Sequence, residues 1–106
     1  MKWIDVDRDG DRVRLVMKME RLDSRVAEEV RAELTTSLPR EAVQVELDLS
    51  RVEFADSMGI SVLMIVLKLL PKEAPRMRLC GCRPELRQVF DLVHLDYLCD
   101  IEGGRP

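Results

Sequence analysis

The strongest constraint on the fold is a change of apolar period in the middle of the chain. Residues Val43 to Leu49 alternate apolar and polar side chains, which is typical of a β-strand with one buried face. Residues Ser57 to Leu70 are apolar on nearly all sides and end at Pro71. The β-branched residues of this run favour a strand, but its length and the Asp56-Ser57 pair at its start predict a buried helix. A strand followed by an apolar helix therefore forms the centre of the fold.

The same two periods extend over the rest of the chain. In sequence order the further predicted elements are a hairpin of Ile4–Asp7 and Val13–Met19 around the turn Asp9-Gly10-Asp11, a helix from an Asp23-Ser24 cap to Leu38, a strand at Met77–Leu79, a helix from Pro84 to Leu95, and an optional edge strand at Tyr97–Ile101. Strands that alternate with helices need crossover connections, so we expect an α/β domain with a mixed, mostly parallel sheet of four to five strands. Residues Glu102 to Pro106 are expected to form a frayed tail.

Length and composition set the size of the domain and exclude several classes of partner. A chain of 106 residues with 46% hydrophobic residues supplies one core, so residues 1–106 are expected to form a single domain. Its 17 basic and 20 acidic residues give a net charge of −3, which provides no positive field for nucleic acid. The longest apolar run, Ile60 to Leu67, is far shorter than the ~20 residues that cross a bilayer, and the first residues show no secretory signal. We therefore expect a cytoplasmic protein without a nucleic acid partner or membrane insertion.

The residue patterns that usually catalyse reactions or hold metals are missing from the sequence. There is no Gly-x-Ser-x-Gly elbow, no glycine-rich phosphate loop and no His-Glu-x-x-His pair. Cys80-Gly81-Cys82 has one residue between its cysteines where redox and zinc motifs have two, and Cys99 makes the count odd, so Cys80 is expected to pack as a small apolar residue. The single histidine, His94, has no triad partner at a recognisable spacing and is expected to be structural or on the surface. The sequence therefore predicts neither an enzyme nor a metal or cofactor site.

The junction between the central strand and the apolar helix is the segment most indicative of function. In parallel α/β sheets, ligands and partners are met at the loops that follow the carboxyl ends of strands, and Asp56 and Ser57 lie in such a loop. Ser57 is expected in the first helical turn, where unpaired N–H groups and the helix dipole favour oxygen atoms or negative charge. On residue types alone the simpler interpretation is favoured, in which Asp56 and Ser57 are helix caps worth ~1 kcal/mol and Gly59 lets the turn pack closely.

The motif Asp56-Ser57-Met58-Gly59 stands at the head of the apolar helix, after the alternating strand and the apolar residues Val52 and Phe54. In this arrangement the whole chain resembles the STAS domain of bacterial anti-sigma factor antagonists, whose signature is an alternating strand that runs into Asp-Ser-x-Gly. A second match is Leu22-Asp23 before the first helix, where the family has Gly-x-Leu-Asp; Glu20 replaces that glycine, so the local turn is expected to differ. Family members also continue into a further C-terminal helix, which this chain is expected to lack.

The resemblance implies a phosphorylation switch at Ser57. In the family, a partner that is both anti-sigma factor and serine kinase phosphorylates the serine matching Ser57, and a PP2C-type phosphatase removes the phosphate. The unphosphorylated antagonist binds the anti-sigma factor and frees the sigma factor, whereas the phosphorylated antagonist releases its partner. A phosphate adds about −1.5 to −2 charge beside Asp56 and near Glu53, so we expect docking to fail while the fold survives.

The resemblance also implies roles for the residues around Ser57. Asp56 positions the site and caps the helix, Gly59 permits close approach of the partner, and Asp23 lies on a neighbouring loop near the serine. Ser61, one turn further along, is a secondary phosphorylation candidate, although a helix serine more commonly bonds its own backbone.

The apolar helix leaves two interpretations open. Either the sheet and a neighbouring helix cover both of its sides, or one side is an exposed patch that a partner covers. Met58, next to the candidate site, is expected either in the core or on a docking surface, and Met64 is expected in the core.

Two other functions compete with the phosphorylation switch. STAS domains also occur as non-enzymatic adaptor subunits of lipid-transport ABC systems, in which the serine is often replaced, so Ser57 disfavours this alternative. A small nucleotide-binding or hydrolytic protein is favoured only by the capped start of the apolar helix. The oligomeric state, the sigma factor and the physiological output stay open.

Overall fold

Five strands form one mixed sheet in the order β1-β2-β4-β6-β7 in the computed structural model, which describes residues 1–104. The strands are β1 (Ile4–Asp9), β2 (Arg12–Met17), β4 (Gln44–Asp48), β6 (Arg78–Cys80) and β7 (Asp100–Ile101). The β1–β2 pair is the predicted antiparallel hairpin, and each of the other neighbouring pairs is parallel. The predicted α/β class with a mostly parallel sheet is therefore confirmed.

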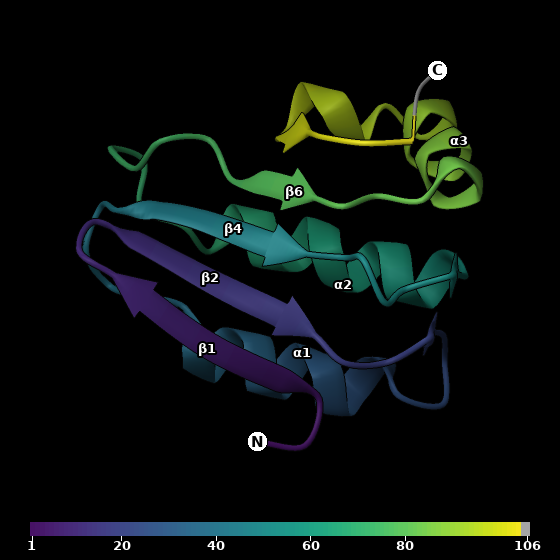
Figure 1. The fold of residues 1–106 in the computed structure, drawn as a ribbon, viewed down its shortest axis with the longest axis horizontal. Coiled ribbons are helices and arrows are strands. Elements are labelled where there is room, and N and C mark those ends of the chain that lie inside the picture. Colours follow the sequence, from purple (N-terminus) through teal and green to yellow (C-terminus); the bar gives the residue numbers. More distant parts are fainter. Residues whose placement is uncertain (105–106) are drawn as a thin grey trace.

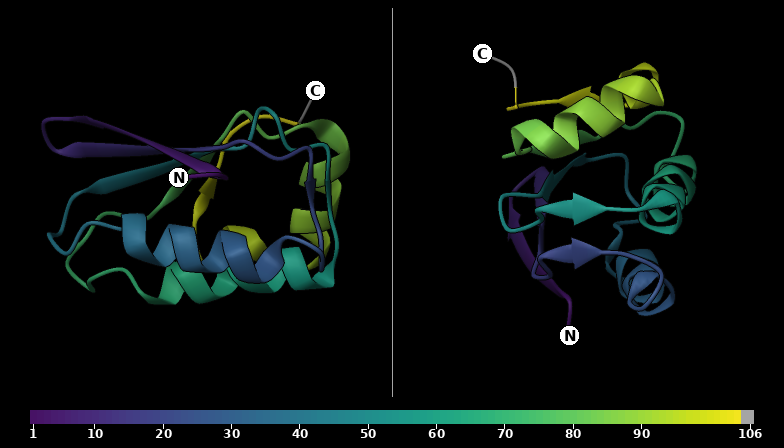
Figure 2. Two further views of the ribbon diagram at one scale, coloured as in Figure 1. Left: turned by 90° about the horizontal axis from the view of Figure 1, so that it is seen from below. Right: turned by 90° about the vertical axis from the view of Figure 1, so that its right-hand side faces the viewer.

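Two helices cover one face of this sheet. The two covering helices are α1 (Ala27–Ser37) and α2 (Ser57–Lys68), and the described chain also forms α3 (Pro84–Leu92) and the 3-10 helix η1 (Leu95–Tyr97). Since β2, β4 and β6 follow one another in one direction across the sheet, crossovers of one hand place α1 and α2 on the same face. Figures 1 and 2 show these two helices side by side behind the sheet and α3 beside its β6–β7 edge. Among the described residues no helix has the length and apolar character needed to span a membrane.

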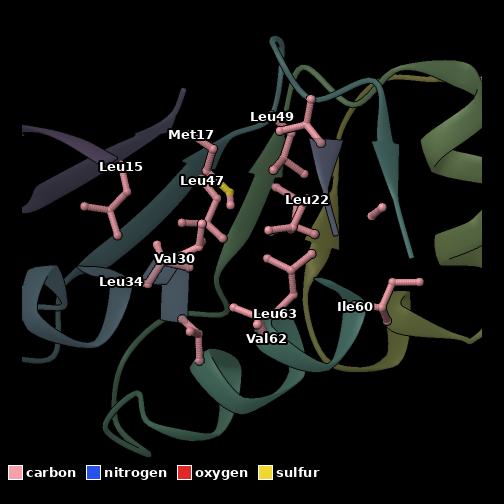
Figure 3. Packing of buried hydrophobic residues seen from close by; sticks show 14 of the residues in the cluster. Leu15, Met17, Leu22, Val30, Leu34, Leu47, Leu49, Ile60, Val62 and Leu63 are labelled. Atoms are coloured by element: carbon pink, nitrogen blue, oxygen red, sulfur yellow. The ribbon is translucent and has the colours of Figure 1, made fainter. Parts of the chain in front are cut away.

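The core lies between the sheet and the two helices (Figure 3). The inward-facing residues of β2 and β4 are the apolar members of their alternating patterns, and they meet the apolar stripe of α1 and one side of α2. The fully enclosed residues at this junction are Leu15, Met17, Val30, Leu34, Leu47, Leu49 and Leu63. The two sequence periods thus correspond to the two layers of the fold.

Helix α2 is buried on two sides and exposed on a third. Val62, Leu63 and Val66 are buried against the sheet and α1, and Met64 packs against the core, as predicted. Three apolar residues on the outer side, spaced by about two turns and then one turn, stay exposed: Met58, Ile65 and Leu69. Both interpretations of the apolar helix are therefore partly correct, because the helix has two covered sides and one exposed stripe.

The opposite face of the sheet has no helix over it within residues 1–104 (Figure 1), and most of the side chains on this face are charged. One row of register partners crosses all five strands with alternating sign, from Asp7 to Arg14, Glu46, Arg78 and Asp100. We call these residues the charged row. Opposite charges on neighbouring strands attract each other, so the charged row stabilises the sheet on its open face. This face accounts for part of the 35% of charged residues in the chain.

The first helix starts later than predicted. The Asp23-Ser24 pair was expected as its cap, but α1 begins at Ala27 after Val26, which makes no side-chain capping bond. The backbone carbonyl of Asp23 accepts hydrogen bonds from the N–H groups of Val26 and Ala27, so Asp23 closes a turn that precedes the helix. The cap was misplaced because this turn has its own bonding partners in a distant segment.

The C-terminal part also differs from its prediction. Helix α3 ends at Leu92 instead of Leu95 because His94 adopts a left-handed conformation with φ 55°. The predicted edge strand is reduced to Asp100–Ile101, since η1 occupies its start. In the expected tail, Glu102 bonds the backbone of β6, and the Gly103 carbonyl accepts a hydrogen bond from the guanidinium of Arg87; residues 105–106 lie outside the described residues. Within the described chain no helix follows β7.

Candidate functional site

Two short strands that the sequence did not predict bring the candidate site together. Strands β3 (Arg21–Leu22) and β5 (Phe54–Ala55) form a small parallel pair, separate from the main sheet. The carbonyl oxygen of Glu20 accepts hydrogen bonds from the N–H groups of Glu53 at 2.8 Å and Phe54 at 3.2 Å. Glu20 itself has no positive φ, so the family glycine is not required here for a left-handed turn. The pair fixes the loop after β2 against the loop after β4.

Asp56 joins these loops to the start of α2. Its Oδ1 accepts a hydrogen bond from the Gly59 N–H at 3.0 Å, which makes it the predicted N-cap of the helix. Its Oδ2 accepts a hydrogen bond from the Ser24 N–H at 3.0 Å. One carboxylate thus holds two segments that lie 32 residues apart.

Gly59 leaves room for this chain's own backbone, a role predicted from the sequence only as close packing of the turn, and its role in partner approach stays a prediction. A Cβ atom at Gly59 would lie 2.1 Å from the carbonyl oxygen of Leu22. Real Cβ contacts are never this short, so any side chain here pushes β3 away from α2. The glycine therefore lets the loop before α1 pack onto the first turn of α2.

Ser57 is the first residue of α2, and its side chain is open to solvent. Its hydroxyl makes no hydrogen bond within residues 1–104, so nothing in the described chain shields it from another molecule. Met58 beside it is 53% exposed, which places it on the surface and outside the core. Ser61, one turn further along, is also exposed, and the expected bond to its own backbone is not formed.

Asp23 lies in the loop that Asp56 binds, and it is nearly buried. Its carboxylate accepts hydrogen bonds from the Arg25 N–H at 3.1 Å and from the Arg25 guanidinium at 3.2 Å. The guanidinium of Arg21 forms a second ion pair with it, at 3.5 Å. The hydrogen bond from the Arg25 side chain holds the pKa of the Asp23 carboxyl below its ordinary value, so Asp23 is ionised at neutral pH.

The surface beside Ser57 is both apolar and cationic. The Arg21 guanidinium lies 4.2 Å from the centre of the Phe54 ring, which is 40% exposed. Arg25 has 78% of its side chain exposed. Sequence reasoning did not single out Arg21, Arg25 or the Ser24 N–H, because only the β3–β5 pairing places them at the site. The two arginines that flank Leu22-Asp23 are the one signal that was available.

The cysteines and His94 lie outside this site. Burial raises the pKa of Cys82 and of Cys99 to about 11, so both thiols are protonated at neutral pH. Cys80 is buried in a strand as predicted, but on the charged face, with its Sγ 3.4 Å from an Oε2 atom of Glu102. His94 is exposed and stacks on Tyr97. Among the described residues there is no group of cysteine, histidine and acidic side chains that would hold a metal.

Comparisons with known proteins agree with this fold. A family model for the STAS domain matches residues 7–102 of the chain. BtrV of Bordetella bronchiseptica, whose name assigns it to the anti-sigma factor antagonists, is 32% identical over 71 residues, which make up 67% of this chain and 61% of BtrV. The matched region thus covers less than two thirds of that relative's length.

Solved structures support the fold at lower sequence identity. The anti-sigma-factor antagonist (STAS) domain protein from Planctomyces limnophilus superposes with a TM-score of 0.84 at 20% identity, over 96% of this chain and 90% of that protein. The anti-sigma factor antagonist SpoIIAA in its unphosphorylated form gives 0.66 at 21% identity, over 96% and 89%. SpoIIAA of Bacillus in its phosphorylated form gives 0.65 at 22% identity, over 94% and 91%. The chain therefore shares the fold of both SpoIIAA forms.

Proposed function

The chain belongs to the STAS domain family, and on this premise we propose that it is an anti-sigma factor antagonist whose partner binding is switched by phosphorylation of Ser57. The observation that supports this most is the position of Ser57, which is exposed, makes no hydrogen bond in the described chain and follows the cap residue Asp56 in an Asp-Ser-x-Gly motif. Similarity to BtrV supports the same class. The proposed partners are an anti-sigma factor that is also a serine kinase and a PP2C-type phosphatase.

The proposed chemistry is carried out by these partners on the Ser57 hydroxyl. In the kinase, a bond forms between Oγ and the γ-phosphorus of ATP, the bond from that phosphorus to the bridging β–γ oxygen breaks, ADP leaves and a kinase base accepts the hydroxyl proton. In the phosphatase, water supplies the oxygen that displaces the serine oxygen, which regains a proton. This chain contributes an accessible hydroxyl on a rigid, capped helix end.

The switch depends on charge at a docking surface. The exposed residues around Ser57 include Met58 and Phe54, which are apolar, and Glu53, which is acidic. A phosphate adds about −1.5 to −2 charge to this surface, and a partner that matches the neutral hydroxyl must then desolvate that charge. We therefore expect phosphorylation to weaken binding without a change of fold.

Phosphate transfer from labelled ATP in a lysate of the source organism tests the site. The wild-type protein is compared with Ser57→Ala and with Ser61→Ala, an exposed serine of the same helix that serves as the matched control. Label is expected on the wild type and on Ser61→Ala and is expected to be absent from Ser57→Ala. Equal label on the wild type and Ser57→Ala contradicts Ser57 as the site.

Binding to the isolated kinase partner tests the switch. Ser57→Ala is expected to bind as tightly as the unmodified protein, whereas Ser57→Asp is expected to bind at least about tenfold more weakly, since like charge at an interface costs free energy. Equal affinities of the two variants in a calorimetric titration contradict the mechanism. Co-purification with an ATPase in place of a kinase would instead assign the chain to the adaptor class.

A further inference from the structure

We propose that, when Ser57 is phosphorylated, Arg25 breaks its ion pair with Asp23 and binds the phosphate within the same molecule. Arg21, beside it, stays paired with Asp23. This inference rests on the proposed function, because it concerns the phosphorylated state of the same site. It adds a second event to the switch, in which an ion pair already present in the unphosphorylated protein is exchanged for a new one.

The position of the arginines is fixed by contacts to the residue next to Ser57. The Asp56 carboxylate accepts a hydrogen bond from the Ser24 N–H at 3.0 Å, and Ser24 is followed directly by Arg25. The backbone N–H of Asp56 in turn donates to the carbonyl of Leu22 at 3.3 Å, directly after Arg21. Both arginines are therefore attached next to backbone atoms that bind Asp56. From either position, an extended arginine side chain is long enough to reach a phosphate on Ser57, the residue that follows Asp56.

Two arginines of this loop share one carboxylate oxygen. Asp23 supplies one carboxylate, and both Arg21 and Arg25 direct a guanidinium nitrogen to its Oδ2, at 3.5 and 3.2 Å. Arg21 is also held over Phe54, whereas Arg25 is 78% exposed at its side chain and free to turn. Arg25 is thus the arginine that moves, and Arg21 is the one that stays with Asp23.

A phosphate is a stronger acceptor for Arg25 than the present one. It has about −1.5 to −2 charge at neutral pH and three acceptor oxygens, and arginine binds phosphate through two parallel hydrogen bonds. The charged groups on the segments that meet at the start of α2 are Glu20, Arg21, Asp23 and Arg25 on the loop before α1, Arg51, Glu53 and Asp56 on the segment before α2, and Glu85 on α3 beside Phe54. Arg21, Arg25 and Arg51 are the cations of this set, and of these only Arg21 and Arg25 are bonded in sequence to residues whose backbone atoms bind Asp56.

Exchange of the ion pair changes the charges that the loop before α1 presents to a partner protein. The unphosphorylated protein presents Asp23 with two arginines, and the phosphorylated protein presents Asp23 with Arg21 alone. A partner that contacts this loop therefore senses phosphorylation at Asp23 as well as at Ser57.

The test uses protein into which phosphoserine is inserted at position 57 during translation, so that it needs no kinase. The second pKa of the phosphate is measured by 31P NMR titration in the otherwise unchanged protein, in Arg25→Gln and in Arg25→Lys. Arg25→Gln is expected to raise this pKa by about 0.5 or more toward its ordinary value near 6, and Arg25→Lys is expected to lie between the two, because lysine retains the charge without the paired hydrogen bonds. The Asp23 carboxyl, followed by 13C NMR, is expected to titrate at higher pH once Ser57 is phosphorylated.

A matched control separates this local effect from general electrostatics. Arg8→Gln removes an arginine that pairs with Glu41 at the hairpin end of the sheet, opposite the start of α2, and is expected to leave the phosphate pKa unchanged. Equal phosphate titrations of the unchanged protein and Arg25→Gln overturn the proposal, and so does an equal change in Arg25→Gln and Arg8→Gln. Neither result bears on whether Ser57 is phosphorylated or controls binding, because the ATP-labelling and partner-binding experiments decide that separately.

Discussion

At the scale of single residues, Gly59 tests how closely the site is packed. Helix propensity alone favours alanine over glycine by about 1 kcal/mol in a helix. The structure predicts the opposite sign, because a Cβ atom at this position would lie 2.1 Å from the Leu22 carbonyl oxygen, and that backbone is held in the β3–β5 pair. We expect Gly59→Ala to lower the free energy of unfolding by about 1–3 kcal/mol, as overpacking does.

Urea denaturation measures this change, with Ser61→Ala as the control on the exposed side of the same helix. The control is expected to stay within about 0.5 kcal/mol of the wild type. A Gly59→Ala protein more stable than the wild type would show that β3 moves away at no cost. In that case the close packing of Gly59 against Leu22 would not contribute to stability.

At the scale of elements, the charged row tests what stabilises the open face of the sheet, over which no helix lies within residues 1–104. Glu46 lies at the centre of this row and is nearly buried, with Arg14 at 3.6 Å on one side and Arg78 at 3.7 Å on the other. Glu46→Lys places three cations side by side on adjacent strands. We expect a loss of about 3 kcal/mol or more in the free energy of unfolding, since a nearly buried charge then has no partner.

Asp7→Lys is the matched control, since it makes the same charge reversal in the same row but on the exposed edge strand β1. Its expected cost is below about 1 kcal/mol, because exposed charges are screened by water and salt. The loss in Glu46→Lys should be smaller in high salt. Equal losses for the two variants in chemical denaturation would mean that the centre of the row contributes no more than its edge.

The elements also show which parts of the structure could be predicted from sequence. Long segments with a clear period, such as β2, β4 and α2, were predicted because each repeats its pattern several times. Strands β3 and β5 have two residues each, too few to show any period, and they form only because their loops meet in space. The motif residues Asp56 and Ser57 were found for the same reason as α2, as the start of a long helix. The Ser24 N–H, which bonds Asp56, and the nearby Arg21 and Arg25 are placed by the β3–β5 pair and were missed.

At the scale of the whole molecule, the core and the candidate site occupy different parts of the structure. The core lies between the sheet and the inner sides of α1 and α2 (Figure 3). Ser57 is the first residue of α2, and this end of the helix lies beyond the carboxyl ends of the central strands (Figure 1). None of the enclosed core residues contacts solvent at that end. A charge added at Ser57 therefore enters water, and it interacts favourably with the N-terminal end of the helix dipole.

This separation predicts a switch that changes the surface and leaves the fold intact. Protein with phosphoserine at position 57 is expected to unfold in urea within about 1 kcal/mol of the unmodified protein, because the Ser57 hydroxyl has no bond to lose in the described chain and the helix dipole contributes about 0.3–1 kcal/mol. In 15N NMR spectra, shift changes are expected in residues 21–25 and 53–61 and not in β1 or the hairpin turn. A loss above about 3 kcal/mol, or shift changes throughout the sheet, would mean that phosphorylation acts by unfolding the domain.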